Sequence, residues 1–206
     1  MKGHVDDTCW EIARAAFVHS MGGYRFLTLQ KNCPPRWGPD LRHEYVYAAS
    51  CLAFCALGAW AIGCRASVCA WLGGTTGWPY FSERMLLIHG CADVLQGLLS
   101  FSSDVVLVDV PSAVHLADRA LAVLLTLLGV YIEVTVLLFS GLSVPLRTLM
   151  AALLAGALVH HFQAKAAISQ QIYQTYVRSH TLWHLGICAS LPLPVSLAIG
   201  RSIFGL

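Results

Sequence analysis

The chain has 206 residues, of which 57% are hydrophobic and 12% charged, and its mean hydropathy is +0.64. Soluble domains carry about 25% charged residues, so this composition excludes an ordinary soluble domain and predicts an all-α, polytopic transmembrane helix bundle. The formal net charge of +2 is too small to indicate a nucleic-acid partner.

Residues 1–44 are expected to be a polar N-terminal extension that ends in a proline-rich connector, "NCPPRWGPD" at 32–40. Early acidic residues and the lack of a long apolar core argue against a signal peptide here. Lysine and arginine are densest in this leader, so the positive-inside rule places the N-terminus on the cytosolic, stromal or matrix side. The organelle stays open between the mitochondrial inner membrane, the thylakoid and the endoplasmic reticulum.

Residues 45–206 are expected to form a transmembrane helical domain. Its apolar runs approach or reach the ~20 residues that cross a bilayer core. They predict five spans, with six or seven left open, at 45–63, 84–103, 115–142, from Pro145 to the "HHFQAK" stretch at 160–165, and 180–199.

Three details of these spans follow from single residues or short segments. The third span is either one long helix or two short ones broken near Gly129. Residues 164–179 are too polar to cross, and are expected at the interface or in a protein-lined crevice. Pro192 and Pro194 predict a kink or a break in the last span.

The second predicted span carries a polar stripe. At about 100° per residue, spacings of 4, 3, 4 and 4 keep its polar residues within a narrow sector of one helix face. Ionisable residues inside a bilayer normally face the bundle interior or a water-filled cavity. The stripe is therefore expected to line the bundle interior or a water-filled cavity. It consists of His89, Asp93, Gln96, Ser100 and Asp104.

The last predicted span begins with a histidine pair, His180 and His184, at an i, i+4 spacing that allows one helix face to bind one metal ion. A third ligand from another helix would leave an open position for water, as in catalytic zinc sites. His115, at the start of the third predicted span, is a candidate for that ligand. Asp118, three residues after His115, is placed to accept the other ring proton of a ligand histidine.

Structural explanations exist for the same residues. His180 follows a polar segment and could sit among lipid headgroups, and His160 with His161 reads as an interfacial boundary. His89 and Asp93 could be an internally satisfied pair, since polar contacts of about 0.6–2 kcal/mol commonly hold membrane helices together. The sequence "HLADR" at 115–119 could be a helix start with an internal salt bridge.

Three motifs resemble the CREST superfamily of membrane proteins, which includes alkaline ceramidases, adiponectin and progestin receptors and post-GPI-attachment proteins. They are "SFSSD" at 100–104, "HLADR" at 115–119 and "SHTLWH" at 179–184. The resemblance implies a seven-helix bundle in which three histidines hold zinc. It matches His180 and His184 to two ligands, Ser100 to the family serine and Asp118 to the family aspartate. The chain departs from the family at Asp104, where the family has its first histidine, so either His115 substitutes from another element or Asp104 is the third ligand.

Two functions compete on these features. The resemblance implies a zinc-dependent lipid amidase or esterase, with activity retained or lost, in which Asp118 orients or deprotonates water and Ser100 helps to hold the oxyanion. The alternative is a non-catalytic accessory subunit of a respiratory or photosynthetic membrane complex, whose partners are membrane lipids and other subunits. A haem or chlorophyll carrier, with His89 and His160 as axial ligands, is the third hypothesis.

The first function requires one polar cluster at a membrane boundary. With five spans, the second ends on the side where the third and fifth begin. We therefore expect His180 and His184 to face inward, toward 100–104 and 115–118, and Trp183 to lie on the flank of the pair against lipid or a neighbouring helix.

Overall fold

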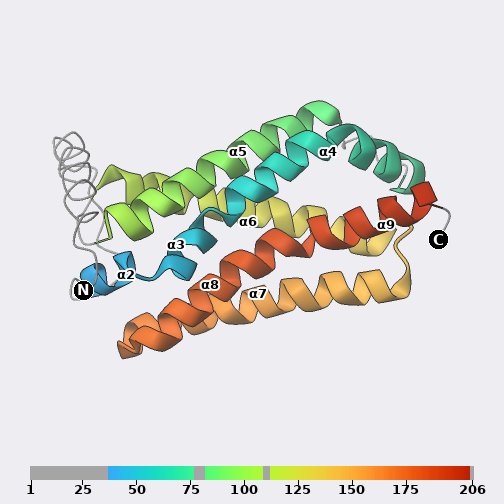
Figure 1. Ribbon diagram of the computed structural model, residues 1–206. Helices are drawn as coiled ribbons and strands as arrows, with labels where there is room; N and C mark the ends of the chain where they lie inside the picture. Colours follow the sequence, from blue (N-terminus) through green and yellow to red (C-terminus); the bar gives the residue numbers. More distant parts are fainter. Residues whose placement is uncertain (1–36, 77–81, 109–111, 205–206) are drawn as a thin grey trace, which may run out of the picture.

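The computed structural model describes residues 37–76, 82–108 and 112–204. Within these ranges the chain forms helices joined by turns, and no strand. The long helices run beside one another, with α2 at one end of the bundle and α9 at the other (Figure 1). The all-α bundle expected from the sequence is confirmed, whereas the leader up to residue 36 lies outside the described residues.

The helices follow one another in chain order as α2 (Gly38–Arg42), α3 (Tyr45–Cys51), α4 (Ala53–Thr76), α5 (Glu83–Phe101), a π-helical turn (Ser102–Val106), α6 (Ala113–Phe139), α7 (Val144–Gln170), α8 (Tyr173–Ser190) and α9 (Pro192–Phe204). Within the described ranges, five stretches are long and apolar enough to span a membrane: Tyr45–Leu72, Glu83–Val106, Ala113–Phe139, Val144–Gln170 and Tyr173–Arg201. The chain is thus an integral membrane protein, with the five spans that its apolar runs predict.

The structure decides between the two alternatives for the third span. Helix α6 is continuous through Gly129, so the third span is one long helix. Residues 164–179 form the end of α7 and the start of α8 around a turn at Gln171, where φ is 58°. The two helices extend this far because Ala164, Ala167 and Tyr176 bury their inner faces while the polar outer faces stay exposed.

The expected break in the last span is confirmed. Helix α8 ends at Ser190 and α9 begins at Pro192. Proline lacks an N–H group and is tolerated in the first turn of a helix, where that group has no intrahelical partner. The same preference explains why α7 opens at Val144–Pro145.

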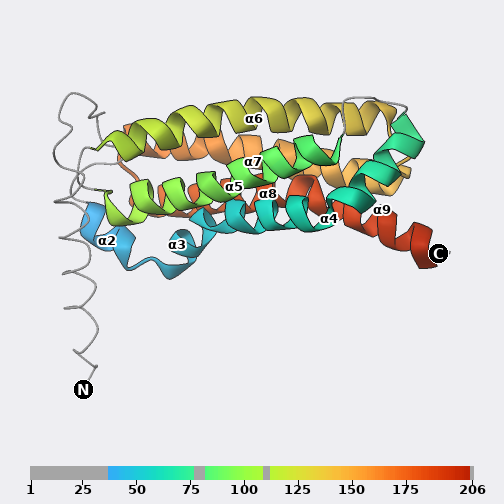
Figure 2. The same ribbon diagram turned by 90° about the horizontal axis from the view of Figure 1, so that it is seen from above.

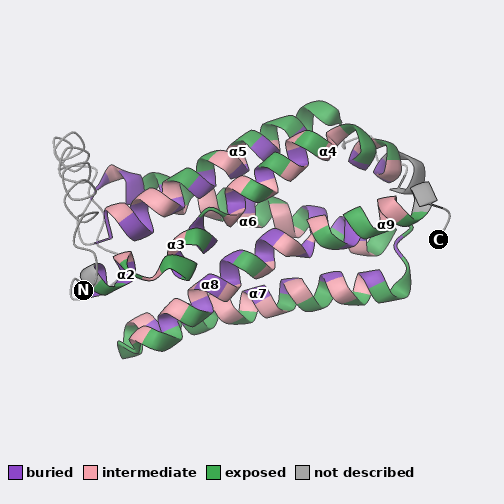
Figure 3. Ribbon diagram, viewed as in Figure 1, coloured by how far each residue is buried: buried purple, intermediate pink, exposed green. Residues whose placement is uncertain are grey.

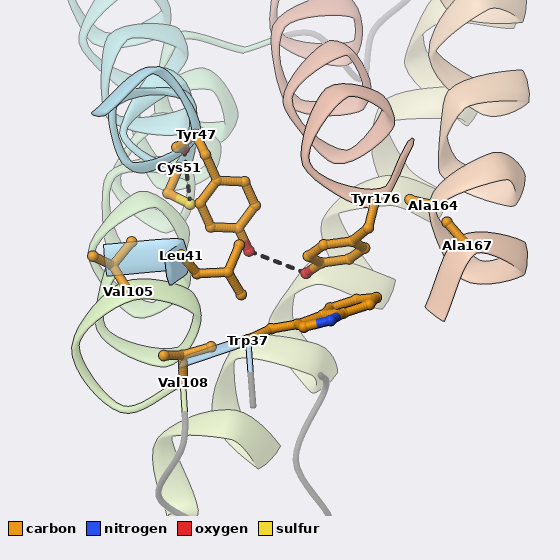
Figure 4. Close-up of a cluster of buried hydrophobic side chains, with 9 residues drawn as sticks. All are labelled: Trp37, Leu41, Tyr47, Cys51, Val105, Val108, Ala164, Ala167 and Tyr176. Carbon is orange, nitrogen blue, oxygen red and sulfur yellow. Dashed lines mark hydrogen bonds between the residues drawn. The ribbon is translucent and has the colours of Figure 1, made fainter. Parts of the chain in front are cut away.

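The bundle is built from two closely packed helix pairs, α4 with α5 and α7 with α8, and α6 lies along both (Figures 1 and 2). Buried residues form stripes on the inward faces of these helices, and exposed residues cover the outer faces (Figure 3). Part of the predicted leader belongs to this core. Trp37 and Leu41 pack on Tyr47, Val105 and Tyr176 at the N-terminal end of the bundle (Figure 4).

Glycines bring α4 and α5 into close contact. A Cβ atom placed on Gly58 would overlap the carbonyl oxygen of Gly90, and one on Gly97 would overlap the sulfur of Cys55. Small residues at membrane helix interfaces allow the backbones to approach, and van der Waals packing then stabilises the pair. This contact holds the start of the α5 polar stripe against α4.

Replacement of Gly58 by alanine is therefore expected to lower the free energy of unfolding by about 1–3 kcal/mol, the usual result of overpacking. Gly63 of the same helix is the matched control, because a Cβ atom there meets nothing within 4 Å. Gly63→Ala should leave stability unchanged or raise it, since alanine favours the helix. Denaturant titration of both variants in detergent micelles tests this, and equal stabilities would contradict the close contact.

Candidate metal centre

Asp104 is placed by a local change in helix geometry. Helix α5 continues into the π-helical turn Ser102–Val106, and the Asp104 side chain within it is buried. Single π-helical turns are rare and are frequent at functional sites. Ser103 lies within the same turn, and its hydroxyl is 3.2 Å from the Ser100 carbonyl and 3.4 Å from the Asp104 carboxylate.

His180 and His184 face the interior from consecutive turns of α8. Their ring centroids are 4.4 Å apart. His180 Nε2 lies 3.2 Å from a carboxylate oxygen of Asp104. One ligand atom from each of the three residues lies within 4.8 Å of the other two, and no other described His, Cys, Asp or Glu residues form such a set. We call Asp104, His180 and His184 the Asp–His–His group.

A hydroxyl group orients the ring of His184. Ser50 Oγ is 2.7 Å from the Tyr47 carbonyl, to which it donates, and 3.4 Å from His184 Nδ1. Because the serine proton is used on the carbonyl, the serine oxygen is left to accept a hydrogen from Nδ1. That tautomer keeps a lone pair on Nε2, and such a contact to the second ring nitrogen is typical of metal-ligand histidines.

Aromatic rings enclose the two imidazoles. The His180 ring packs against both Tyr47 and Tyr176, with centroid distances of 5.3 and 5.2 Å, and the two tyrosine hydroxyls are 3.0 Å apart (Figure 4). Phe54 packs edge-on against His184 at 5.3 Å. The contact between the two tyrosine hydroxyls connects α3 to α8, and both tyrosine rings hold the His180 ring in place.

Ser100, Asp118 and Gln96 form a hydrogen-bonded set beside the group. Gln96 Nε2 donates to Asp118 Oδ1 at 2.7 Å, and Ser100 Oγ donates to the same oxygen at 2.8 Å. Gln96 Nε2 is also 3.0 Å from Ser100 Oγ. The two candidate catalytic residues of the sequence, Ser100 and Asp118, are thus brought into direct contact across α5 and α6.

His115 does not join the Asp–His–His group. Its side chain is fully buried, and Nε2 lies 3.1 Å from the carbonyl of Leu107. The ring contacts this carbonyl because Leu107 directly follows the π-helical turn and His115 lies in the first turn of the next helix, α6. Of the two sequence candidates for the third ligand, the structure therefore brings Asp104 to the histidines and keeps His115 apart.

A cavity of about 550 Å³, here called the main cavity, joins these features. Its polar wall includes all members of the Asp–His–His group together with Ser100, Asp118 and Gln96. Its other walls are largely apolar, and Val123 and Leu127 of α6 line it while remaining 59% and 66% exposed. The main cavity therefore extends from the polar centre to the outer face of α6.

The inward orientation expected for the histidines agrees with this geometry. Trp183 packs on the ring of His161 in α7 at 4.7 Å, so it meets a neighbouring helix, one of its two expected environments. The buried stripe on α5 was visible in the sequence, and it contains Gln96. Ser50 and Tyr47 were missed, and the only signal for them was their polarity within an apolar run.

Comparison with protein-family models, with curated proteins and with solved structures finds no match to this chain. The site is therefore interpreted from its own residues and geometry.

Gln96 is expected to stabilise the Ser100–Asp118 contact. Gln96→Leu removes a donor from a buried carboxylate, which should lower the free energy of unfolding by about 1–3 kcal/mol. Gln174→Leu, on an exposed position of α8, is the control and should stay within about 0.5 kcal/mol of the wild type. Denaturant titration in detergent compares the two, and equal effects would show that the Gln96 amide contributes nothing.

Proposed function

We propose that the protein is a zinc-dependent hydrolase of lipid amide or ester bonds, of the CREST type that its motifs resemble. The supporting observation is the position of the Asp–His–His group on the wall of a cavity that reaches the outer face of α6. An acyl chain that enters from the bilayer would require an apolar rim on a membrane span, whereas a soluble substrate would not.

The donor set fits zinc. Two imidazoles and one carboxylate are ligands that zinc binds in catalytic sites, where a fourth position stays open. Ser50 fixes a tautomer of His184 that leaves Nε2 available. When bound, zinc supplies Lewis acidity to a carbonyl oxygen and allows water to act as a nucleophile near neutral pH.

Side chains of this protein carry out the remaining steps of the hydrolysis, which are proton transfer and stabilisation of the oxyanion. Asp118 takes the proton from the attacking water, and Gln96 and Ser100 orient its carboxylate through their hydrogen bonds. As the oxyanion develops, Ser100 Oγ turns its hydrogen bond to this oxygen, while Gln96 keeps its hydrogen bond to Asp118. Asp118 then passes the proton taken from water to the leaving amine or alcohol. The aromatic rings around His180 exclude bulk water, which strengthens these contacts.

The same arrangement supports an orientation for the protein. The Asp–His–His group lies at the end of the bundle where α2 packs, because Asp104 is in the π-helical turn that contacts α2. The basic leader places that end on the cytosolic, stromal or matrix side. The main cavity then faces the membrane leaflet on that side, and its substrates are lipids of that leaflet.

Zinc content is the first test. The purified wild type is expected to bind about one zinc ion per chain, and His184→Ala to lose most of it. The control is His160→Ala, because His160 is on the exposed side of α7 and contacts Gln163; it should keep the wild-type zinc content. Elemental analysis measures all three. A wild type that binds no zinc, even after addition of the metal, and that migrates with a large membrane complex would instead favour an accessory subunit.

Turnover is the second test. Asp118→Asn should retain zinc but lower the hydrolysis of lipid amides or esters at least about 100-fold, because the general base is lost. Asp40→Asn, an exposed change on α2, should retain wild-type activity. Release of fatty acid from mixed micelles is the measurement. An Asp118→Asn variant that hydrolyses lipid at the wild-type rate would remove Asp118 from the mechanism.

A further inference from the structure

A second group of buried ionisable residues lies farther along the polar stripe of α5. Asp93 of α5 and Glu133 of α6 are 1% and 2% exposed. They line a small, mostly apolar cavity of about 40 Å³, together with His89 and Thr126. Since 15 residues separate His89 from Asp104 along the helix, roughly 22 Å at 1.5 Å per residue, this inner cavity is distinct from the metal centre.

Each of the two carboxyl groups has an oxygen without a hydrogen-bond partner. These are Asp93 Oδ2 and Glu133 Oε2, and His89 Nδ1 is a third such atom. His89 Nε2 approaches Asp93 Oδ2 to 3.4 Å, an ion-pair distance without hydrogen-bond alignment. A polar group buried without a partner in a membrane interior is costly. The inner cavity therefore requires a ligand that satisfies several oxygen atoms at once.

The charges around the inner cavity limit what this ligand is. The residues described as lining it include no lysine or arginine. Cys188 of α8 interacts with both carboxyl groups and with Cys55 of α4, and both cysteines are free thiols. His89, Asp93 and Glu133 do not form a set of three ligand atoms within 4.8 Å, in contrast to the Asp–His–His group. A directly coordinated metal ion does not fit, whereas a proton with water does.

The size of the cavity agrees with water. One water molecule needs roughly 10–15 Å³ of such volume and 2–4 polar partners. About 40 Å³ therefore accommodates two or three water molecules. Asp93, Glu133, His89 and Thr126 supply their partners from α5 and α6.

The contacts of Ser190 indicate where a proton is held. Ser190 Oγ lies 2.8 Å from the Ile187 carbonyl and 2.6 Å from Glu133 Oε1. A serine hydroxyl has one proton, so it can donate to only one of these acceptors. If the proton goes to the carbonyl, the hydrogen in the shorter contact must come from Glu133. A protonated Glu133 satisfies both contacts, and an ionised one leaves a pair of oxygens facing each other without a shared proton.

We propose that the inner cavity is a proton-binding site, in which water links the carboxyl groups of Asp93 and Glu133 and His89 exchanges the proton with the outside. Release converts the Glu133 carboxylic acid to a carboxylate and passes its proton through water to the His89 imidazole. His89 is suited to this step because its side chain is 12% exposed, whereas that of Asp93 is 2% exposed. The site is independent of zinc and of lipid hydrolysis.

Infrared spectroscopy of the full-length protein in lipid nanodiscs tests the proposal. The wild type is expected to show the carbonyl-stretch band of a buried carboxylic acid at neutral pH, with a shift in D₂O. Glu133→Gln should remove the part of this band assigned to Glu133, and Asp93→Asn should change its intensity. Glu83→Gln is the control, because Glu83 is exposed at the start of α5 and pairs with Arg65, and it should leave the band unchanged.

Two further variants keep both carboxyl groups. Ser190→Ala removes a hydrogen bond to Glu133, so it should move the band to higher frequency without lowering its intensity. His89→Gln should slow hydrogen–deuterium exchange at the band at least about tenfold, as expected for the loss of a proton shuttle. A band that is absent at every pH, or one unaffected by Glu133→Gln, Asp93→Asn and Ser190→Ala, would overturn the site. Unchanged exchange in His89→Gln would overturn the role of His89.

Discussion

The structure depends on the need of buried polar groups for partners inside the protein. Hydrocarbon supplies no hydrogen bonds, so an ionisable residue on a membrane span must meet another helix or a water-filled cavity. Helix α5 carries its polar side chains on one face, and the helix packs against α4, α6 and α3. The packing of the bundle is therefore the arrangement that gives each of these side chains something to contact.

Close packing of α4 on α5 positions one side of this face. Glycines at the contact let the helix backbones approach, and Ser50, at the end of α3 just before α4, reaches His184. The hairpin of α7 and α8 positions the opposite side and presents both histidines to Asp104. Two helix pairs that are separate in the sequence thus complete one group of ligands.

The stripe on α5 serves two different environments along its length. Near the N-terminal end of the bundle, Asp104 meets imidazoles and opens into the main cavity. Deeper in the bundle, Asp93 faces a small cavity without an approaching cation. The difference comes from α8 and α6, because α8 contributes histidines at the first level, whereas α6 contributes Glu133 at the second. The same pattern on one helix therefore contributes to the proposed metal centre at one end and to the proposed proton site at the other.

The sequence alone determined the class, the five spans, the polar stripe and the inward histidine pair, because hydropathy and helical periodicity are local properties of the chain. Only the tertiary structure decided between Asp104 and His115. From the sequence, either residue could be the third ligand. In the structure the π-helical turn directs Asp104 to His180, whereas the His115 ring contacts the Leu107 carbonyl. It also joined Ser190 to Glu133. Contacts between helices distant in sequence leave no periodic signal, so no pattern along the chain could have predicted them.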